Sequence, residues 1–240
     1  MRNIRVVFAV LSLSVVLVAG VADELQAQEK RQGWTKRLRY RRELRRELQG
    51  EIQLSGAFAL YPMAVKWAEE FRKIHPKVRI DISAGGAGKG ITDALAKVVD
   101  LGMVSRDIYP QELEKGAFPI AVVKDAVVPT INSNNPLIDQ ILATGLKQQV
   151  AQDLWIHTTA RTWGDVLGTG STIPVHVYTR SDACGAAETF AAWLGAKQED
   201  LEGTAVFGDP GVTSVVQRDK VGIGFNNIAY AYDINSKKPY

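Results

Sequence analysis

The stretch "EIQLSGAFALYPMAVKWAEEFRKIHPKVRIDIS", residues 51–83, changes its hydrophobic period twice. Its first five residues, "EIQLS", have the composition of a strand, and its last seven, "KVRIDIS", alternate apolar and polar side chains. Between them, apolar residues recur at helical spacing: Leu60, Ala64, Trp67, Ala68 and Phe71. Pro76 ends the predicted helix at His75, because proline disfavours helical geometry in its predecessor. Strand, helix and strand in succession predict an α/β architecture.

The same alternation continues along the chain in both directions from this stretch. Further strands are predicted at residues 101–105, 173–180 and 221–225, and on both sides of Lys124-Asp125 within residues 118–131. Helices are predicted at 91–100, 136–145, 147–155, 162–168 and 186–195, with "AGGAGKG" (84–90) as a loop. We therefore expect mixed, mostly parallel sheets with helices on both faces. Proteins of this class bind ligands outside the carboxyl ends of their strands.

The N-terminus has the pattern of an export signal. Arg2 and Arg5 precede an apolar run over residues 6–22, and small residues follow. Residues 1–27 are predicted to be a signal peptide, cleaved after Ala22 or Ala27. A membrane anchor is the alternative, although the run is short for a span and no second apolar segment follows.

The cysteine content narrows the compartment. Cys184 is the only cysteine, so the chain has no intrachain disulfide and no lipid-bearing cysteine after the apolar run. An exported, unlipidated and disulfide-free protein indicates the periplasm of a Gram-negative bacterium.

The net charge of +3 combines two regions of opposite sign. Residues 30–47 hold nine Lys and Arg against two Glu, within a basic leader arm predicted at 28–50, whereas the chain from Leu48 onward carries a net −3. A basic arm can bind nucleic acid or an anionic membrane. We favour a solvated arm and no nucleic-acid partner, because an exported protein rarely meets nucleic acid.

Three predicted strand-to-helix junctions share one composition. Each has small residues between the strand and the helix: 55–58, 83–88 and 181–186. A helix N-terminus carries unpaired N–H groups and partial positive charge, and small residues let an anion approach the backbone. Arg106 and Arg180 could add charge-assisted hydrogen bonds. Each junction alone is typical of an ordinary capped turn, but the three together predict an oxyanion site.

Other chemistries fit the sequence less well. "AGGAGKG" fails the phosphate-loop pattern, because Ser83 stands five positions before Gly88, where the first glycine belongs, and Gly90 replaces the Ser or Thr after the lysine. No spacing of His and Cys predicts a metal, and no cofactor is expected. Cys184 before a helix could be a nucleophile. An enzyme is disfavoured, because nothing in the sequence places one of the three histidines beside Cys184.

Five motifs resemble, in order, those of the phosphate-binding proteins of bacterial ABC transporters. They are "LSGAFALYPMAVKWAEEF", "VDLGMVSRDIYPQE", "TWGDVLG", "YTRSDACGAAETF" and "VGIGFNNIAYAY", and the match runs from about Glu51 to Tyr232. The resemblance implies a two-lobed, type II periplasmic binding protein fold with the ligand in a cleft between the lobes. It also implies lobe 1 at 51–124, lobe 2 at 125–225, and a hinge with the start of a return to lobe 1 at 226–240.

The family holds its anion with four loops, which the resemblance places on this chain as follows. Ala57 and Phe58 match the first loop, where a hydroxyl residue usually precedes the Phe. Ser83 and the glycines that follow it, including Gly86, match the second. Ser105 and Arg106 match the third.

The fourth loop departs most from the family pattern. Arg180, Ser181 and Gly185 match its Arg, first Ser and Gly, while Cys184 replaces its second Ser and Ala186 its Thr. The family also continues beyond the strand near Ile223, so the sequence is expected to be either a fragment truncated at its C-terminus or a shortened protein.

The resulting hypothesis is a periplasmic protein, expected to be monomeric, that captures a tetrahedral oxyanion for an inner-membrane ABC permease. Phosphate is the first candidate ligand. The alternative is a binding protein for another oxyanion, or a sensory or adhesive relative that serves no transporter. A cysteine-dependent enzyme using Cys184 ranks third.

Overall fold

The computed structural model describes residues 48–232 and Ser236. The predicted signal peptide and nearly all of the predicted basic arm lie outside the described residues. Among the residues that are described, no helix is both long and apolar enough to cross a membrane.

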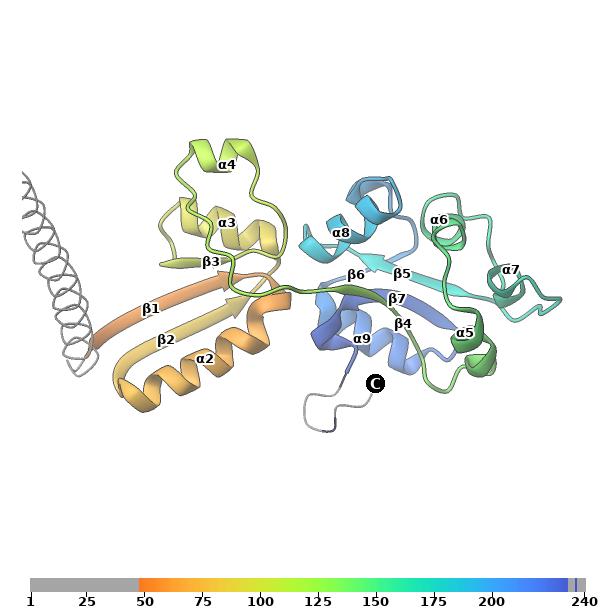
Figure 1. The fold of residues 1–240 in the computed structure, drawn as a ribbon, viewed down its shortest axis with the longest axis horizontal. Helices are drawn as coiled ribbons and strands as arrows, with labels where there is room; N and C mark the ends of the chain where they lie inside the picture. Colours follow the sequence, from red (N-terminus) through yellow and green to blue (C-terminus); the bar gives the residue numbers. More distant parts are fainter. Residues whose placement is uncertain (1–47, 233–235, 237–240) are drawn as a thin grey trace, which may run out of the picture. The chain divides into compact units, whose positions relative to one another are not determined.

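The first sheet has three parallel strands in the order β2-β1-β3. Its strands are β1 (Gln49–Gly56), β2 (Lys77–Ala84) and β3 (Leu101–Met103). The short 3-10 helix η1 (Phe58–Leu60) and α2 (Tyr61–Ile74) join β1 to β2, α3 (Ala87–Leu95) joins β2 to β3, and α4 (Pro110–Glu114) follows. Helices α2 and α3 lie on opposite faces of this sheet (Figure 1).

The second sheet has four strands in the order β4-β7-β5-β6. They are β4 (Val127–Ile131), β7 (Gly222–Asn227), β5 (His176–Arg180) and β6 (Thr204–Val206); β4 runs antiparallel to β7, and the other pairs are parallel. The helices are α5 (Ile138–Thr144), α6 (Gln148–Trp155), α7 (Trp163–Leu167), α8 (Gly185–Trp193) and α9 (Gly208–Arg218), with the 3-10 turns η2 (Gln198–Asp200) and η3 (Ile228–Tyr230).

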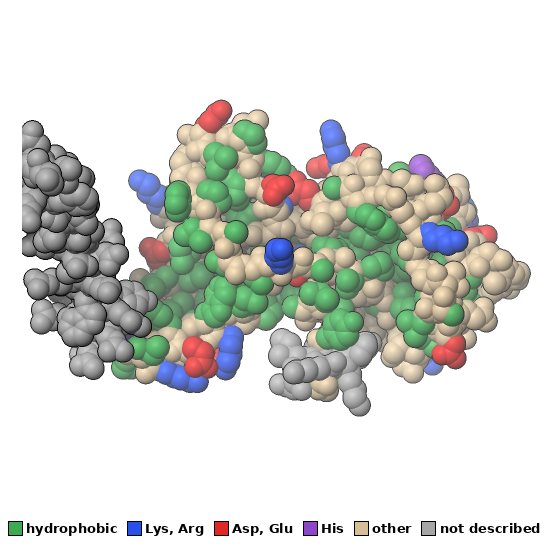
Figure 2. All heavy atoms as spheres, viewed as in Figure 1, with side chains coloured by type: hydrophobic (Ala, Val, Ile, Leu, Met, Phe, Trp, Pro, Cys, Tyr) green, Lys and Arg blue, Asp and Glu red, His purple; other side chains and the backbone are tan. Residues whose placement is uncertain are grey.

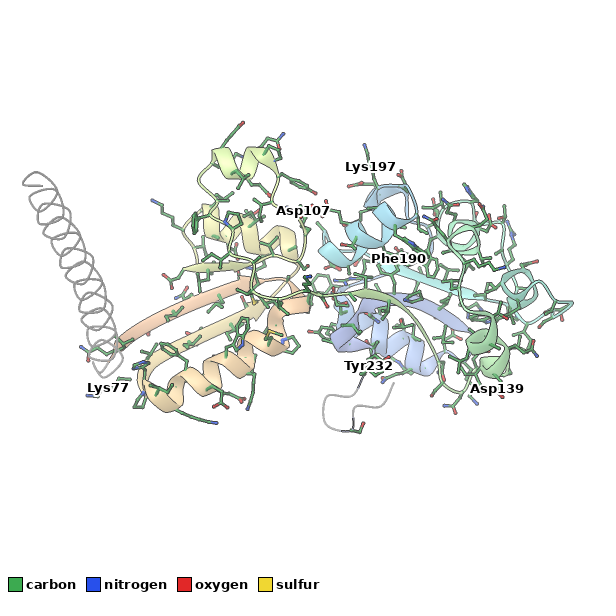
Figure 3. All side chains as sticks on the ribbon, in the orientation of Figure 1. Lys77, Asp107, Asp139, Phe190, Lys197 and Tyr232 are labelled. Atoms are coloured by element: carbon green, nitrogen blue, oxygen red, sulfur yellow. The ribbon has the colours of Figure 1, made fainter. Side chains whose placement is uncertain are left out.

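The second sheet carries the larger core. Fourteen buried residues form one cluster between it and its helices. Phe190 lies on α8 (Figure 3). Its ring stacks on Phe225 of β7 with centroids 4.4 Å apart, and Trp155 meets it edge-on at 4.9 Å. The indole N–H groups of Trp155 and Trp163 donate to the carbonyls of Tyr178 and Val221, each at 3.0 Å. Burial and paired polar atoms together stabilise this region.

The first sheet has a much smaller core. Its cluster contains four buried residues, Ala57, Ala64, Ala87 and Met103. Twelve of the exposed large hydrophobic side chains in the described residues precede Lys124, and five follow it. Figure 2 shows hydrophobic side chains at the surface of this region. Trp67, expected on the inner face of its helix, is 46% exposed.

Two sequence predictions of secondary structure were wrong in part. Helix α3 begins at Ala87, inside the predicted loop, and ends at Leu95 instead of Asp100. A Cβ on Gly90 would overlap the carbonyl oxygen of Met103, so this glycine serves close packing of a helix on the sheet. Residues 118–123 were expected to form a strand, but they have no regular structure, and Phe118 is 86% exposed.

Candidate functional site

The three predicted junctions converge on one another in space. Gly86, at φ 89°, lies against the loop after β5: a Cβ there would sit 2.9 Å from the carbonyl oxygen of Ala183. The N–H of Gly88, in the first turn of α3, donates to that same carbonyl at 3.5 Å. A Cβ on Gly185 would overlap the backbone and hydroxyl of Ser105. Because only glycine has no Cβ, these residues let the loops of the two sheets approach closely.

The first junction contributes the ring of Phe58 to this region. The Phe58 ring centroid lies 5.9 Å from the guanidinium carbon of Arg180 and 5.8 Å from the Phe207 ring. The Phe58 carbonyl accepts a hydrogen bond from the Tyr230 hydroxyl at 3.0 Å. Ala57 is buried, and its N–H donates to the Met103 carbonyl at 2.8 Å, so that N–H serves the first sheet.

Arg180 is the centre of the convergence. It ends β5, and its side chain is fully buried between two carboxylates. Its Nε and Nη2 donate to Asp182 at 2.8 and 2.7 Å, and its Nη1 donates to Asp209 at 2.8 Å. Burial alone would lower the pKa of Arg180, but the hydrogen bonds to Asp182 and the charge of Asp209 raise it above its ordinary value. The guanidinium therefore stays charged.

The carboxylates around Arg180 are satisfied by further donors. Asp182 also accepts from the N–H of Gly208 at 3.0 Å, and Asp209 accepts from the N–H and the side-chain amide of Asn227 at 2.8 and 2.9 Å. Arg180 carries one positive charge and faces the negative charges of Asp182 and Asp209, so the three side chains together have a formal charge of −1. The pKa of Asp125 is raised, first by desolvation of its carboxyl group and then by the charge of Asp209.

The fourth-loop residues 184–186 form the start of α8. Cys184 is its N-cap, with Sγ accepting from the N–H of Ala187 at 3.5 Å and the Cys184 N–H donating to Gln198 Oε1 at 3.2 Å. Burial raises the pKa of the Cys184 thiol to about 11. Ala186 is fully buried in the core of the second sheet. The fourth loop thus offers backbone donors and no hydroxyl at these positions.

The arrangement around Cys184 does not favour nucleophilic catalysis. A thiol with a raised pKa is protonated at neutral pH, and only the thiolate is a strong nucleophile. His176, the one histidine on β5, begins the strand that Arg180 ends, and its Nδ1 lies 2.6 Å from Asp219. This imidazole is paired at the other end of the strand.

The remaining predicted donors are placed differently. Ser83 is exposed, and its hydroxyl donates to the Leu54 carbonyl at 3.4 Å. Ser181 is also exposed, and its N–H donates to the Val206 carbonyl at 3.0 Å. The structure therefore brings Phe58, Gly86, Ser105 and residues 184–186 together around Arg180, but it leaves these two serines at the surface.

Arg106 is occupied by glutamates. Its Nη1 and Nη2 donate to Glu112 of α4 at 2.9 and 2.7 Å, and its Nε lies 3.5 Å from Glu188 of α8. The guanidinium stacks 4.0 Å above the Tyr109 ring, and the Tyr109 hydroxyl donates to Glu188. We call Arg106, Tyr109, Glu112 and Glu188 the rim latch, since they tie the first-sheet region to α8. Hydrogen bonding to Glu112 raises the pKa of Arg106.

Two residues of the buried group were missed by the sequence reasoning. Asp209 in "GDPG" has the signature of a helix start, with an acid in the first turn before a proline. Asn227 is the second of two asparagines that follow an apolar strand, and polar residues at a strand's carboxyl end are a usable signal in this fold class. Nothing in either pattern indicates that both residues reach one another and Arg180.

No other site competes with this one in the part of the chain that the structure describes. Within it, no group of three or more His, Cys, Asp and Glu could hold a metal ion. An open hollow of about 600 Å³ lies at the start of β5, where Thr158, Arg161, His176 and Tyr178 are among its lining residues. It contains none of the predicted ligand residues.

Solved structures resemble this chain over most of its length. A putative phosphate ABC transporter substrate-binding protein with bound phosphate from Clostridium perfringens is 26% identical, with a TM-score of 0.69, over 79% of this chain and 74% of that one. An ABC-type phosphate transport receptor from Vibrio cholerae, 20% identical with a TM-score of 0.54 over 75% of this chain and 72% of that one, shares the fold.

Curated relatives are similar over part of their length. The phosphate-binding protein PstS of Xylella fastidiosa (strain Temecula1) is 28% identical over an alignment of 205 positions that covers 75% of this chain and 54% of the relative. PstS 2 of Streptococcus pneumoniae (strain TIGR4) is 34% identical over 88 residues, 37% of this chain and 30% of the relative. The chain thus spans about half or less of the length of these two relatives.

The family model described as "PBP superfamily domain" matches residues 42–238. This match supports a binding protein and not an enzyme, and the mostly parallel α/β sheets confirm the predicted fold class. The chain belongs to the PBP superfamily domain family and has the two-lobed fold of a type II periplasmic binding protein.

Proposed function

We propose that this protein captures a tetrahedral oxyanion, with phosphate as the first candidate, between its two lobes. The observation that carries the proposal is the convergence of the three strand-to-helix junctions at Arg180. The phosphate-bound protein from Clostridium perfringens supports the choice of ligand by its similarity.

The donors for the anion come from Arg180 and from the start of α8. A guanidinium has five N–H donors, and three of those of Arg180 are used by Asp182 and Asp209. The other two can donate to an oxyanion, as can the first N–H groups of α8, which have no partner within the helix. With Ala57, Cys184 and Ala186 in place of hydroxyl residues, the site relies on backbone and guanidinium donors.

A carboxylate beside the anion gives a means of selection. It accepts a hydrogen bond from a protonated phosphate, whereas fully ionised sulfate has no proton to offer and is repelled. Asp182 suits this role better than Asp107, because it is buried at the convergence, 3.2 Å from the place of a Cβ on Gly86, while Asp107 is exposed.

The cellular role follows from the same proposal. Residues 51–124 and 125–225 form the two lobes, residues 226–240 begin the return to the first, and the protein acts as a periplasmic monomer that delivers its ligand to an inner-membrane ABC permease. Export by residues 1–27, without a lipid anchor, is part of this proposal. Phosphate uptake by cells that lack the gene, with and without the restored gene, tests the transport role.

Thermal unfolding with phosphate, arsenate, sulfate and molybdate, each at matched ionic strength, tests ligand binding. A ligand at 100 times its dissociation constant stabilises the fold by about 2.7 kcal/mol. We expect phosphate and arsenate to raise the Tm and sulfate to leave it unchanged. A larger shift with sulfate or molybdate would identify another oxyanion as the ligand. A folded protein that responds to none of the four would overturn the proposal.

A further inference from the structure

Asp209 links three elements of the second sheet. It lies in the first turn of α9 with its side chain 1% exposed. One carboxylate oxygen accepts from Arg180 at the end of β5, and the other accepts twice from Asn227 at the end of β7. The ends of β5, α9 and β7 therefore share a single carboxylate.

This carboxylate completes the orientation of the Arg180 guanidinium. Asp182 takes Nε and Nη2, which form one edge of the guanidinium, and Asp209 takes Nη1 on another edge. A planar group held on two edges has a fixed plane, so the directions of its two remaining N–H bonds are also fixed.

Asp209 also ties Arg180 to the connections between the sheets. Asn227 pairs with Val127 where β4 begins, and the N–H of Ile228 donates to the Ala126 carbonyl at 2.8 Å. Tyr230 follows Asn227 by three residues, and its hydroxyl donates to the carbonyl of Phe58, whose ring faces Arg180.

We propose that Asp209 is a positioning residue for anion binding, which holds Arg180 so that its two remaining N–H groups donate to the ligand. The inference rests on the proposed function. As a charge, Asp209 opposes an incoming anion. As a holder of Arg180, it favours the anion. These two effects have opposite signs, so one substitution can separate them.

The test compares Asp209→Asn with Asn132→Ala by calorimetric titration of phosphate. Asp209→Asn removes a negative charge and leaves one acceptor oxygen where Arg180 and Asn227 use two. Positioning predicts an affinity about 10- to 100-fold lower, the size of a lost hydrogen bond to a charged group. Asn132→Ala removes a buried amide that donates to the Val216 and Gln217 carbonyls at the other end of α9, so its affinity should stay within about twofold while its Tm falls. Unchanged or higher affinity in Asp209→Asn would overturn the inference.

A second variant covers the case in which Asp209→Asn does not fold. Asp209→Glu keeps the charge and moves the carboxylate by one methylene, so positioning predicts lower affinity, and a purely electrostatic role predicts no change. A second measurement needs no ligand. NMR of arginine-labelled protein reports the rotation of each guanidinium, and the signal that is lost in Arg180→Lys is assigned to Arg180. Slow rotation about its Nε–Cζ bond is expected in the wild type and faster rotation in Asp209→Asn.

The two readouts distinguish the possible failures. A wild type that binds no anion would refute the proposed function, and the positioning role with it. A wild type that binds phosphate while both Asp209 variants keep its affinity would refute the positioning role alone. Unchanged Arg180 rotation in Asp209→Asn would show that Asp182 is sufficient to hold the guanidinium.

Discussion

Cys184 combines a structural role at a helix start with weak hydrogen-bonding chemistry. It caps α8 as a serine would, because its sulfur accepts the hydrogen bond of the Ala187 N–H. Sulfur is a weak acceptor, and the thiol is a weak donor. Cys184 therefore caps the start of α8 but is a weak donor for a ligand.

The buried thiol predicts a loss of stability in alkali. Burial raises the pKa of Cys184 from 9.0 to about 11. Between these values the unfolded chain has already released the proton that the folded chain retains, so the free energy of unfolding falls as pH rises. The loss for one group is at most about 1.4 kcal/mol per pH unit.

Urea unfolding at pH 8, 9, 10 and 11 measures this effect. Cys184→Ser is the matched control, since serine does not titrate in this range and also caps a helix. Tyr178 and Tyr230, whose pKa values are raised by burial, remain in both proteins, so the difference isolates the thiol. Parallel pH profiles for the two proteins would contradict the prediction.

Gly185→Ala tests the close approach of the junctions. A Cβ at position 185 would overlap the Ser105 backbone, so α8 must move away from Ser105. We expect a destabilisation of about 1–3 kcal/mol and weaker phosphate binding. Gly170→Ala is the control, because a Cβ there has no neighbour within 4 Å. Equal Tm and affinity in the two variants would contradict the packing argument.

At the scale of elements, the rim latch joins α4, α8 and the loop after β3, which carries Asp107 (Figure 3). Arg106 was expected to face the ligand, but here its guanidinium is held by glutamates. Glu112 lies six residues along the chain, and Glu188 lies 82 residues away. Arg106 follows Ser105 in the sequence, but the sequence does not show that the Arg106 guanidinium contacts Glu112 and Glu188.

Glu188→Gln should therefore open the latch. It removes the charge facing Arg106, and a partly exposed pair of this kind is worth up to about 1 kcal/mol. We expect bound phosphate to dissociate about 2- to 5-fold faster, with little change in the association rate, in stopped-flow measurements. Glu199→Gln removes a neighbouring exposed charge without an Arg106 contact and should leave the dissociation rate unchanged. Similar rates in the two variants would exclude a latch.

The order of most elements could be predicted from local patterns, but their ends depended on packing. Alternation of apolar and polar residues predicted β5. The helix predicted at 162–168 is α7 (Trp163–Leu167), where Thr162 and Asp165 cap each other's backbone N–H groups. Gly90 lies in the predicted loop 84–90, where four glycines in seven residues lower helix propensity. Its helical state depends on contact with Met103, which is not local. Residues 118–123 likewise have a high strand propensity, but they would form a strand only beside a neighbouring strand.

At the scale of the molecule, the sequence could predict the fold class and the convergence of the three strand-to-helix junctions. Small residues at strand ends carry that information, because the fold class fixes which ends meet. The buried group around Arg180 could not be predicted, since Asp209 and Asn227 become neighbours only when α9 packs beside β5 and β7. Charge pairing of this kind depends on tertiary structure.

The unequal cores have a consequence for local opening. Amide hydrogens exchange with solvent when a segment opens, and the opening free energy depends on how much apolar surface the segment buries. With a cluster of four buried residues against fourteen, β1 and β2 should open at a lower free energy than β5 and β7. Native-state hydrogen exchange should show this order, and equal protection of the two sheets would contradict it. Since the proposed ligand contacts both lobes, phosphate should slow exchange in β1 more than in β7, so occupancy of the site can be read from the amides of the less protected sheet.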